Sequence, residues 1–346
     1  MAMDTGTLVR SSTGTFEELA AKVRSAGLLD PRPGYYALKI AFNLAVLAGT
    51  WTAVVLVGDS WWQLALAVVL AGGYVQTGFI AHDTGHKQIT RTRTGGALLG
   101  LLHMNLLLGI AYGWWVSHHN RHHSNPNNLD LDPDTVRRPV IFAPDELPVK
   151  GRTRGRRFII RFQSVMFFVL LAHEAYRVRS AGVKAFRAGA LKTPALELAL
   201  VAVHLAAYLV VVFTVMAPAQ AVAFVLVHQL LFGLYLGAVF APNHKGMVVY
   251  RSDVDLDWLH RQVLTSRNVY SSRFTDMVFG GLNYQIEHHL FPTMPRVNLR
   301  RARPIVKAYC EQHGIPYLEV PVLASYRAVS RFFGRVSRRA LAGTAA

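Results

Sequence analysis

The chain has 346 residues, of which 52% are hydrophobic and only 16% are charged, against about 25% charged residues in soluble domains. A single cysteine, Cys310, excludes a disulfide framework, a four-cysteine zinc site and a cysteine-ligated iron–sulfur cluster within this chain. The net charge of +17 suggests a nucleic-acid partner, but lysines and arginines that flank apolar segments orient membrane proteins and attract anionic lipid head groups instead. We therefore predict an integral membrane protein that does not bind nucleic acid.

Four apolar segments are long enough to cross a membrane, since a bilayer core of about 30 Å needs roughly 20 helical residues. They occupy residues 40–57, 61–80, 198–217 and 221–241, and none contains Asp, Glu, Lys or Arg. Only three residues separate the members of each pair, which predicts two antiparallel hairpins. All 37 Lys and Arg residues lie outside the spans and these connections, so the positive-inside rule places the large loops in the cytoplasm. We predict an all-α membrane protein with four transmembrane helices and a cytoplasmic helical cap.

Two further apolar segments do not have the character of spans. Residues 97–112 are short and are interrupted by His103 and Asn105, which favours a re-entrant piece. A crossing there would place the histidine motifs before and after it at opposite membrane faces. Residues 158–172 contain Arg161 and are flanked by other arginines, which favours a helix lying at the membrane interface.

The same pattern divides the chain into three parts. A cytoplasmic N-terminal segment is predicted at 1–39, a membrane domain at 40–321 and a basic tail at 322–346. No apolar stretch with a cleavage site occupies the first 36 residues, so we expect no secretory signal. The tail is predicted to form an amphipathic helix at the membrane interface, because five arginines oppose an apolar face. The residues of that face are Val329, Phe332, Phe333 and Val336.

Eight histidines fall into three short boxes and one satellite, each at the edge of an apolar segment. The boxes are His82-Asp-Thr-Gly-His86, His119-Asn-Arg-His122-His123 and Gln285-Ile-Glu-His288-His289, and the satellite is His244. The i, i+3 and i+4 spacings bring side chains to one face of a helix. His118 adjoins the second box and is either a surface residue or a hydrogen-bond partner of a ligand. We expect the other six to be ordinary core or surface residues: His103, His173, His204, His228, His260 and His313.

The number of boxed histidines indicates metal. Imidazole binds Zn, Cu, Fe and Ni, and one metal seldom takes more than six ligands. Eight histidines at one membrane face therefore suit two metals better than one. A metal transporter is the remote alternative, but its histidines should line the spans, where only His204 and His228 lie. The pattern favours a membrane-bound metalloenzyme.

The boxes resemble those of the integral-membrane fatty acid desaturase and hydroxylase superfamily. The stretch Asn283-Tyr-Gln-Ile-Glu-His-His-Leu-Phe-Pro292 is similar to the third box of the desaturase branch in which this box begins with glutamine. Residues 119–127 and 233–247 also look like that branch, and the resemblance runs from about Phe16 to Tyr317. Eukaryotic members with this glutamine usually carry a fused cytochrome b5 domain with a His-Pro-Gly-Gly motif, which this sequence lacks. The likeness is therefore to free-standing bacterial-type enzymes of the cytoplasmic membrane.

This resemblance implies O2-dependent desaturation of a long-chain fatty acyl substrate, as acyl-CoA or acyl-lipid. It also implies two iron ions and a separate acidic electron donor, a ferredoxin or a cytochrome b5-type protein with its reductase. A hydroxylase of the same superfamily is the alternative. The implied metal ligands are His82, His86, His119, His122, His123, His244, His288 and His289, with Gln285 as a further candidate.

Polar residues beside the boxes are expected to support the ligands. Carboxylates can accept N–H from a ligating imidazole and fix its tautomer. The candidates are Asp83, Asp130, Asp132, Asp134 and Glu287. Asn243, beside His244, is expected to hold a water molecule at the metals. Arg152, Arg154 and Arg156 are expected to contact either lipid head groups or the acidic donor.

Overall fold

The computed structural model describes residues 14–136, 139–150 and 153–342, which form helices and one short two-stranded sheet. The chain divides into two compact units, and each is considered by itself. The membrane unit comprises residues 31–117 and 170–238. The histidine-rich unit comprises the described residues of the remainder, 14–30, 118–169 and 239–342.

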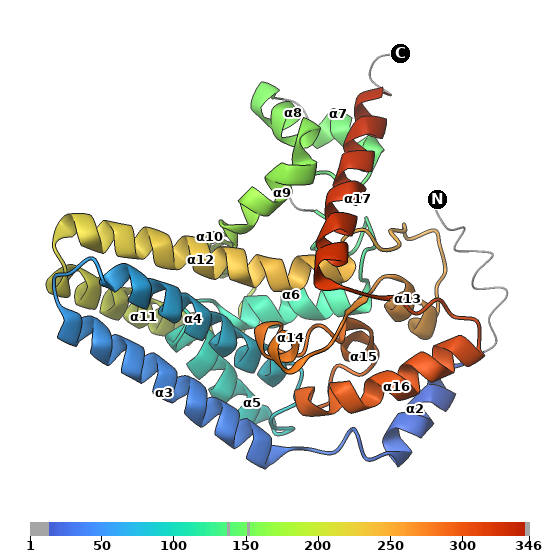
Figure 1. Cartoon of the computed structure of the whole chain (residues 1–346), viewed down its shortest axis with the longest axis horizontal. Coiled ribbons are helices and arrows are strands. Elements are labelled where there is room, and N and C mark those ends of the chain that lie inside the picture. Colours follow the sequence, from blue (N-terminus) through green and yellow to red (C-terminus); the bar gives the residue numbers. More distant parts are fainter. Residues whose placement is uncertain (1–13, 137–138, 151–152, 343–346) are drawn as a thin grey trace. The chain divides into compact units, whose positions relative to one another are not determined.

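Four helices are long and apolar enough to cross a membrane, which confirms the predicted spans (Figure 1). They are α3 (Pro33–Val57), α4 (Gln63–Gly85), α11 (Pro194–Val215) and α12 (Pro218–His244). Three of them begin before the predicted segment. Hydrophobicity marks the part of a helix that suits lipid, whereas the backbone continues into polar turns until a cap ends it. Lys39, Asp83 and Glu197 accordingly lie within these helices.

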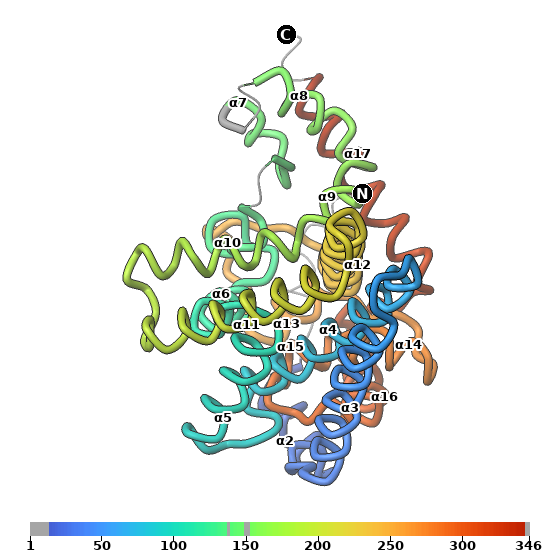
Figure 2. The backbone as a smooth tube through the Cα atoms, turned by 90° about the vertical axis from the view of Figure 1, so that its left-hand side faces the viewer, coloured from blue at the N-terminus to red at the C-terminus, as the bar shows by residue number. Residues whose placement is uncertain are grey.

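In the membrane unit, α3 and α4 pack side by side as a hairpin (Figure 2). Nε2 of Gln63 donates to the carbonyls of Val54 and Gly58 at 2.7 Å each, which satisfies the end of α3. The backbone N–H of Ala217, in the connection from α11 to α12, donates to Oδ1 of Asp59 at 2.8 Å. Both short connections therefore lie at the same end of this unit, as two hairpins require.

Residues 97–112 do not form a helix of spanning length. Helix α5 (Arg93–Gly100) passes into the π-helix η1 (Leu101–Leu106), and the chain then turns at Gly109 before α6 (Tyr112–Ser124) begins. Gly109 has a φ of +66°, a conformation that favours glycine. The segment is thus broken into short pieces, and its re-entrant path stays a prediction.

Buried side chains hold the backbone of this broken segment. Nδ1 of His204, on α11, donates to the carbonyl of Leu106 at 2.9 Å. Arg179, on α10 (Glu174–Arg187), donates to the carbonyl of Leu108 at 2.8 Å. Irregular backbone is tolerated at membrane depth only where protein satisfies it. His204 therefore has a structural role, as expected for a histidine outside the boxes.

The histidine-rich unit contains mostly short helices. Helix α13 packs against α15, α15 against α16, and α16 against α2 (Figure 1). Leu259, Ile286 and Val306 belong to the apolar core of these helices. Strands β1 and β2 pair in parallel. The elements are α2 (Phe16–Ser25), α13 (Trp258–Leu264), β1 (Asn268–Val269), α14 (Arg273–Val278), α15 (Gln285–Leu290), α16 (Arg296–Gln312) and β2 (Glu319–Val320).

The tail forms α17 (Val322–Ala342), so the predicted amphipathic helix is present. Its apolar face, however, packs on protein rather than being left for lipid: Val336 lies in a buried cluster with Ile141 and Ile160, and the Phe333 ring lies 4.5 Å from that of Phe167. Periodicity identifies an apolar face but not what covers it. The covering elements are η2 (Pro144–Glu146), α7 (Leu147–Lys150), α8 (Arg154–Arg161) and α9 (Gln163–Leu171).

Candidate metal centre

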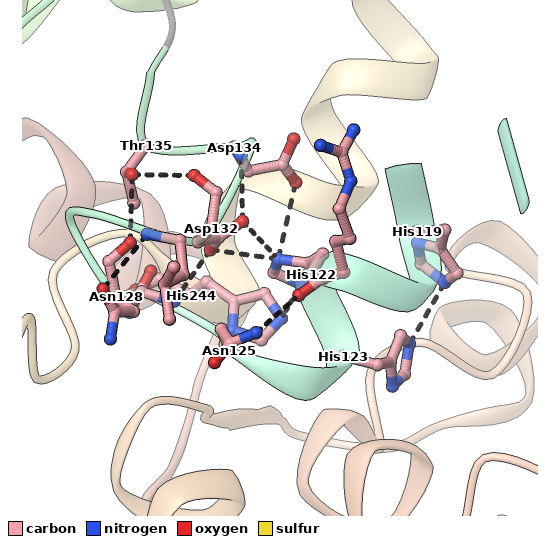
Figure 3. A network of polar contacts seen from close by, with 12 residues as sticks. His119, His122, His123, Asn125, Asn128, Asp132, Asp134, Thr135 and His244 are labelled. Carbon is pink, nitrogen blue, oxygen red and sulfur yellow. Dashed lines mark hydrogen bonds and ion pairs between the residues drawn. The ribbon is translucent and has the colours of Figure 1, made fainter. Parts of the chain in front are cut away.

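The second histidine box lies on α6, and the structure divides it between two clusters. His119 and His123, one turn apart, point toward each other with 3.1 Å between their Nε2 atoms (Figure 3). His122 points elsewhere, toward His244, with 3.3 Å between their Nε2 atoms. Adjacent positions on a helix are about 100° apart, so His122 and His123 face different ways.

The third box divides in the same manner. In the first cluster, ring nitrogens of His119, His123 and His288 lie within 4.8 Å of one another. In the second cluster, those of His122, His244 and His289 do the same. Each of the two adjacent histidine pairs thus contributes one member to each cluster. Five of these six side chains are buried, and His119 is half-buried.

Hydrogen bonds fix the tautomers of the second cluster. Nδ1 of His122 lies 3.0 and 3.1 Å from the two carboxylate oxygens of Asp132 (Figure 3). Nδ1 of His244 lies 3.0 Å from the carbonyl oxygen of Thr265, and Nδ1 of His289 lies 2.8 Å from Oε1 of Gln262. Because all three partners are acceptors, each Nδ1 carries the proton and each Nε2 presents a lone pair.

The three Nε2 atoms form an all-imidazole donor set suited to a metal. Nε2 of His289 is buried and has no hydrogen-bond partner, which is costly unless another group binds it. Burial and the neighbouring imidazoles lower the pKa of His289 well below its usual value, so it stays neutral. Burial also opposes charge on His122, but the Asp132 carboxylate outweighs it and raises the pKa of that residue, so a metal at its Nε2 competes with a proton. Neutral imidazole held by a carboxylate or carbonyl is a usual metal ligand.

Gln285 and Asn243 lie beside this set. Nε2 of Gln285 is 2.8 Å from Nε2 of His244, so the amide reaches the point at which the second cluster converges. Asn243 donates to Oε1 of Gln285 at 3.1 Å and also to the carbonyls of Val239 and Leu282. Asn243 therefore orients Gln285, a more specific arrangement than the water-holding role expected of it.

The candidate carboxylates take different positions. Asp132 supports His122 as predicted, and Asp134 joins His118 at 3.0 Å while lying 3.7 Å from Nδ1 of His122. His118 is thus a hydrogen-bond partner within this network. Asp130 instead pairs with Arg251 on the surface.

Glu287 differs from expectation. Its carboxylate was expected to accept N–H from a ligating imidazole. It accepts hydrogen bonds from Asn268 and Tyr317 instead, both at 2.7 Å. Burial raises the pKa of Glu287 to about 7, although these hydrogen bonds oppose the shift. Successive residues of a helix are rotated by about 100°, so Glu287 points away from the clusters when His288 and His289 of the same helix point into them.

The first box lies in the membrane unit, at the end of α4. His82 is in the last turn and His86 is the residue that caps the helix, with 4.7 Å between their ring centroids. Nδ1 of His82 lies 3.1 Å from Oδ1 of Asp83, and the hydroxyl of Tyr36 donates to Oδ2 of Asp83 at 3.1 Å. The predicted i, i+4 pair and its supporting carboxylate are therefore present within this unit.

Two residues of the site were not predicted from the sequence. Gln262 donates to the backbone carbonyl of His123 at 2.9 Å and holds His289 through Oε1, so it connects the two clusters. Arg267 is almost wholly buried, and its guanidinium binds the carbonyls of Pro242 and Lys245 at the end of α12. A lone glutamine and a lone arginine carry no motif, so only the packing reveals them.

The four apolar helices and the buried histidine clusters define an integral membrane protein that can hold metal. Comparison with known proteins gives the family. Residues 59–321 match the family model for fatty acid desaturases, and the chain belongs to that family, whose members are oxidoreductases.

Characterised relatives carry desaturase names. The chain is 29% identical to an acyl-lipid (9-3)-desaturase of Physcomitrium patens, 30% identical to the Delta(6)-fatty-acid desaturase fat-3 of Caenorhabditis elegans and 28% identical to human fatty acid desaturase 3. These alignments cover 89%, 88% and 90% of this chain, and 59%, 70% and 69% of the respective relatives. The chain thus spans well under the full length of the relatives that it matches.

Proposed function

We propose that this protein desaturates a long-chain fatty acyl substrate, presented as acyl-CoA or as acyl-lipid, in a reaction that consumes O2. The observation that carries the proposal is the pair of histidine clusters in the histidine-rich unit, His119/His123/His288 and His122/His244/His289. Family membership and the names of the relatives support the same reaction class.

Two iron ions are the proposed cofactors. The clusters are all-imidazole, buried and, in the second, held in the tautomer that metal binding needs. The family resemblance leads us to propose that His82 and His86 of the first box complete the ligand set of the first cluster. Bound iron would supply the oxidising power to remove hydrogen from an unactivated methylene, which side chains alone lack.

The protein's own contribution is to position the ligating imidazoles and to enclose the site. Asp132, Gln262 and the Thr265 carbonyl aim three Nε2 atoms at one point. Gln285, oriented by Asn243, lies beside that point and is proposed to help hold the second metal in place. His288 and His289 are closed off from solvent, which protects the reaction from water.

The reaction also needs electrons, and we propose that a separate protein supplies them. We propose an acidic donor, a ferredoxin or a cytochrome b5-type protein with its reductase. We also propose that the site faces the cytoplasm, as the placement of Lys and Arg predicts, and that the membrane is a bacterial cytoplasmic one.

Mass spectrometry of acyl lipids from a host that expresses the full chain tests this function. The wild type should produce acyl chains lacking two hydrogens, and His289→Ala should not. His313→Ala, a histidine outside the boxes, should behave as wild type and is the matched control. Chains that gain oxygen would establish the hydroxylase instead, and unchanged product from His289→Ala would contradict the metal centre.

A further inference from the structure

Helix α9 has apolar side chains on two opposite faces, and α8 carries apolar side chains among its arginines. On the inner face, Ile160, Gln163 and Phe167 are buried against α17. Gln163 donates to the backbone carbonyl of Phe333 at 3.2 Å, and the hydroxyl of Ser337 donates to that of Ile160 at 2.6 Å. This inner face is therefore covered by α17 within the histidine-rich unit.

The outer face is apolar as well, yet no part of the described chain covers it. Each helix contributes two neighbouring apolar side chains at i and i+4, the first pair on α8 and its capping residue and the second on α9, and together these four residues are called the stripe. They are Phe158, Phe162, Val165 and Val169, which are 57%, 44%, 59% and 55% exposed. Helix α9 contains no charged residue, and a helix that is apolar all round is normally buried on every side. Something outside the described chain should cover the stripe.

Arginines of α8 and α17 lie near this stripe. The acidic residues of η2, which also packs against α17, are used elsewhere, because Asp145 pairs with Arg251 and Glu146 accepts the backbone N–H of Phe142 and Ala143. Arg154, Arg157 and Arg161 are exposed on α8. Helix α17 packs against α8 and adds five more exposed arginines, Arg327, Arg331, Arg335, Arg338 and Arg339. Residues 147–173 and 320–346 contain no Asp or Glu. The surface thus combines an apolar stripe with unbalanced positive charge.

We propose that the outer face of α8 and α9 lies in the boundary layer of an anionic lipid leaflet. Phe158, Phe162, Val165 and Val169 would enter the acyl region, and the arginines of α8 and α17 would contact lipid phosphates. An acidic protein would match the arginines but would leave four apolar side chains without a matching surface. The protein as a whole is suited to a bilayer, because four of its helices are long and apolar enough to span one.

This inference decides between the two uses expected for Arg154 and Arg156, which lie on α8 beside the stripe. It assigns them to lipid head groups rather than to an electron donor. Arg152, the third arginine of that expectation, lies outside the described residues. The inference depends on the membrane fold and not on the proposed reaction.

Spin-label accessibility in the full chain tests the proposal. Val165→Cys and, separately, Val169→Cys would carry a nitroxide in a Cys310→Ser background, in nanodiscs of phosphatidylcholine with or without phosphatidylglycerol. Collisions with O2, which concentrates in lipid, should exceed those with a water-soluble nickel chelate severalfold, most strongly with phosphatidylglycerol. A label at Glu311, which is exposed on α16, should show the opposite ratio.

Charge reversal tests the arginines separately. Arg331→Glu/Arg335→Glu should remove the effect of phosphatidylglycerol on the Val165 label, whereas the control Arg24→Glu/Arg301→Glu should retain it. Nickel collisions at Val165 and Val169 that match those at Glu311 in both lipids would overturn the proposal. Shielding that appears only when an acidic donor protein or a second copy of the chain is added would also overturn it.

Discussion

At the scale of single residues, the sequence identifies the ligands but not how they are sorted. The spacing of the second box predicts that His119, His122 and His123 share one face of a helix. All three lie on α6, but only His119 and His123 point toward each other, whereas His122 points toward His244, so the prediction of one shared face is wrong. Their division between two clusters depends on His244 and His288, which other helices bring to them. Tertiary packing supplies that information, and no local spacing contains it. Gln262 was missed for the same reason.

Asp132 can be tested against its neighbour Asp130. Asp132→Asn should lower metal affinity or activity about 10- to 100-fold, because an amide oxygen accepts the Nδ1 proton of His122 more weakly than a carboxylate does and the amide NH2 can favour the opposite tautomer. Asp130→Asn alters exposed contacts, with Arg251 and with the backbone N–H of Ser252, and should change little. Metal content of the two purified variants, measured side by side, checks this. Equal content in both would show that the Asp132 contact has no supporting role.

Gln262 gives a second test. Gln262→Leu removes both the acceptor for His289 and the donor to the His123 carbonyl, and metal affinity should again fall about 10- to 100-fold. Gln262→Glu retains the acceptor for His289, so its metal affinity should fall less than that of the leucine variant. Titration of metal-free protein with ferrous iron would rank the three proteins. If the leucine variant binds as well as the wild type, Gln262 does not position His289.

At the scale of elements, the spans follow from hydropathy because about 20 apolar residues have few alternatives to crossing lipid. The end of α12 is different, since its position decides where His244 lies. Buried Arg267 binds the carbonyls of Pro242 and Lys245 there, and its own N–H donates to the carbonyl of Asn243. Burial lowers the pKa of Arg267 to about 10, which leaves it charged at neutral pH. Its charge also suits the negative end of the helix dipole.

Replacement of Arg267 should loosen this helix end. Arg267→Met leaves buried carbonyls without donors, and we expect a loss of about 1–3 kcal/mol in stability together with reduced metal content. Arg267→Lys keeps the charge but reaches fewer acceptors, so the stability of this variant should lie between that of the methionine variant and that of the wild type. Thermal unfolding in detergent provides the measurement. A methionine variant that unfolds at the wild-type temperature would show that the contacts of Arg267 do not stabilise the end of α12.

At the scale of the whole molecule, composition and the distribution of charge indicate a membrane protein with four spans, and the helices bear this out. Composition did not predict what covers the apolar face of the tail helix α17. An amphipathic pattern looks the same whether lipid or protein covers it, and here α8 and α9 cover α17. Orientation across the membrane remains a prediction from the positions of Lys and Arg.

Thiol labelling of intact cells tests that orientation. Cysteines replacing Asp59 and Ala219, in a Cys310→Ser background, should react with an impermeant reagent from outside. Cysteines replacing Arg93 and Gly155 should react only after the cells are opened. The native Cys310 is buried, so it should react little with the reagent even before its replacement. Outside labelling at Gly155 but not at Arg93 would mean that residues 97–112 cross the membrane, so that the boxes could not share a site.

The central claim is that the histidines hold two irons. The most direct measurement is the metal content of the purified full chain, compared with variants of each cluster. The wild type should contain about two irons per chain, and His288→Ala and His289→Ala should each lose iron while still inserting in the membrane. One iron per chain, zinc that alone supports activity, or undiminished iron in both variants would contradict the claim.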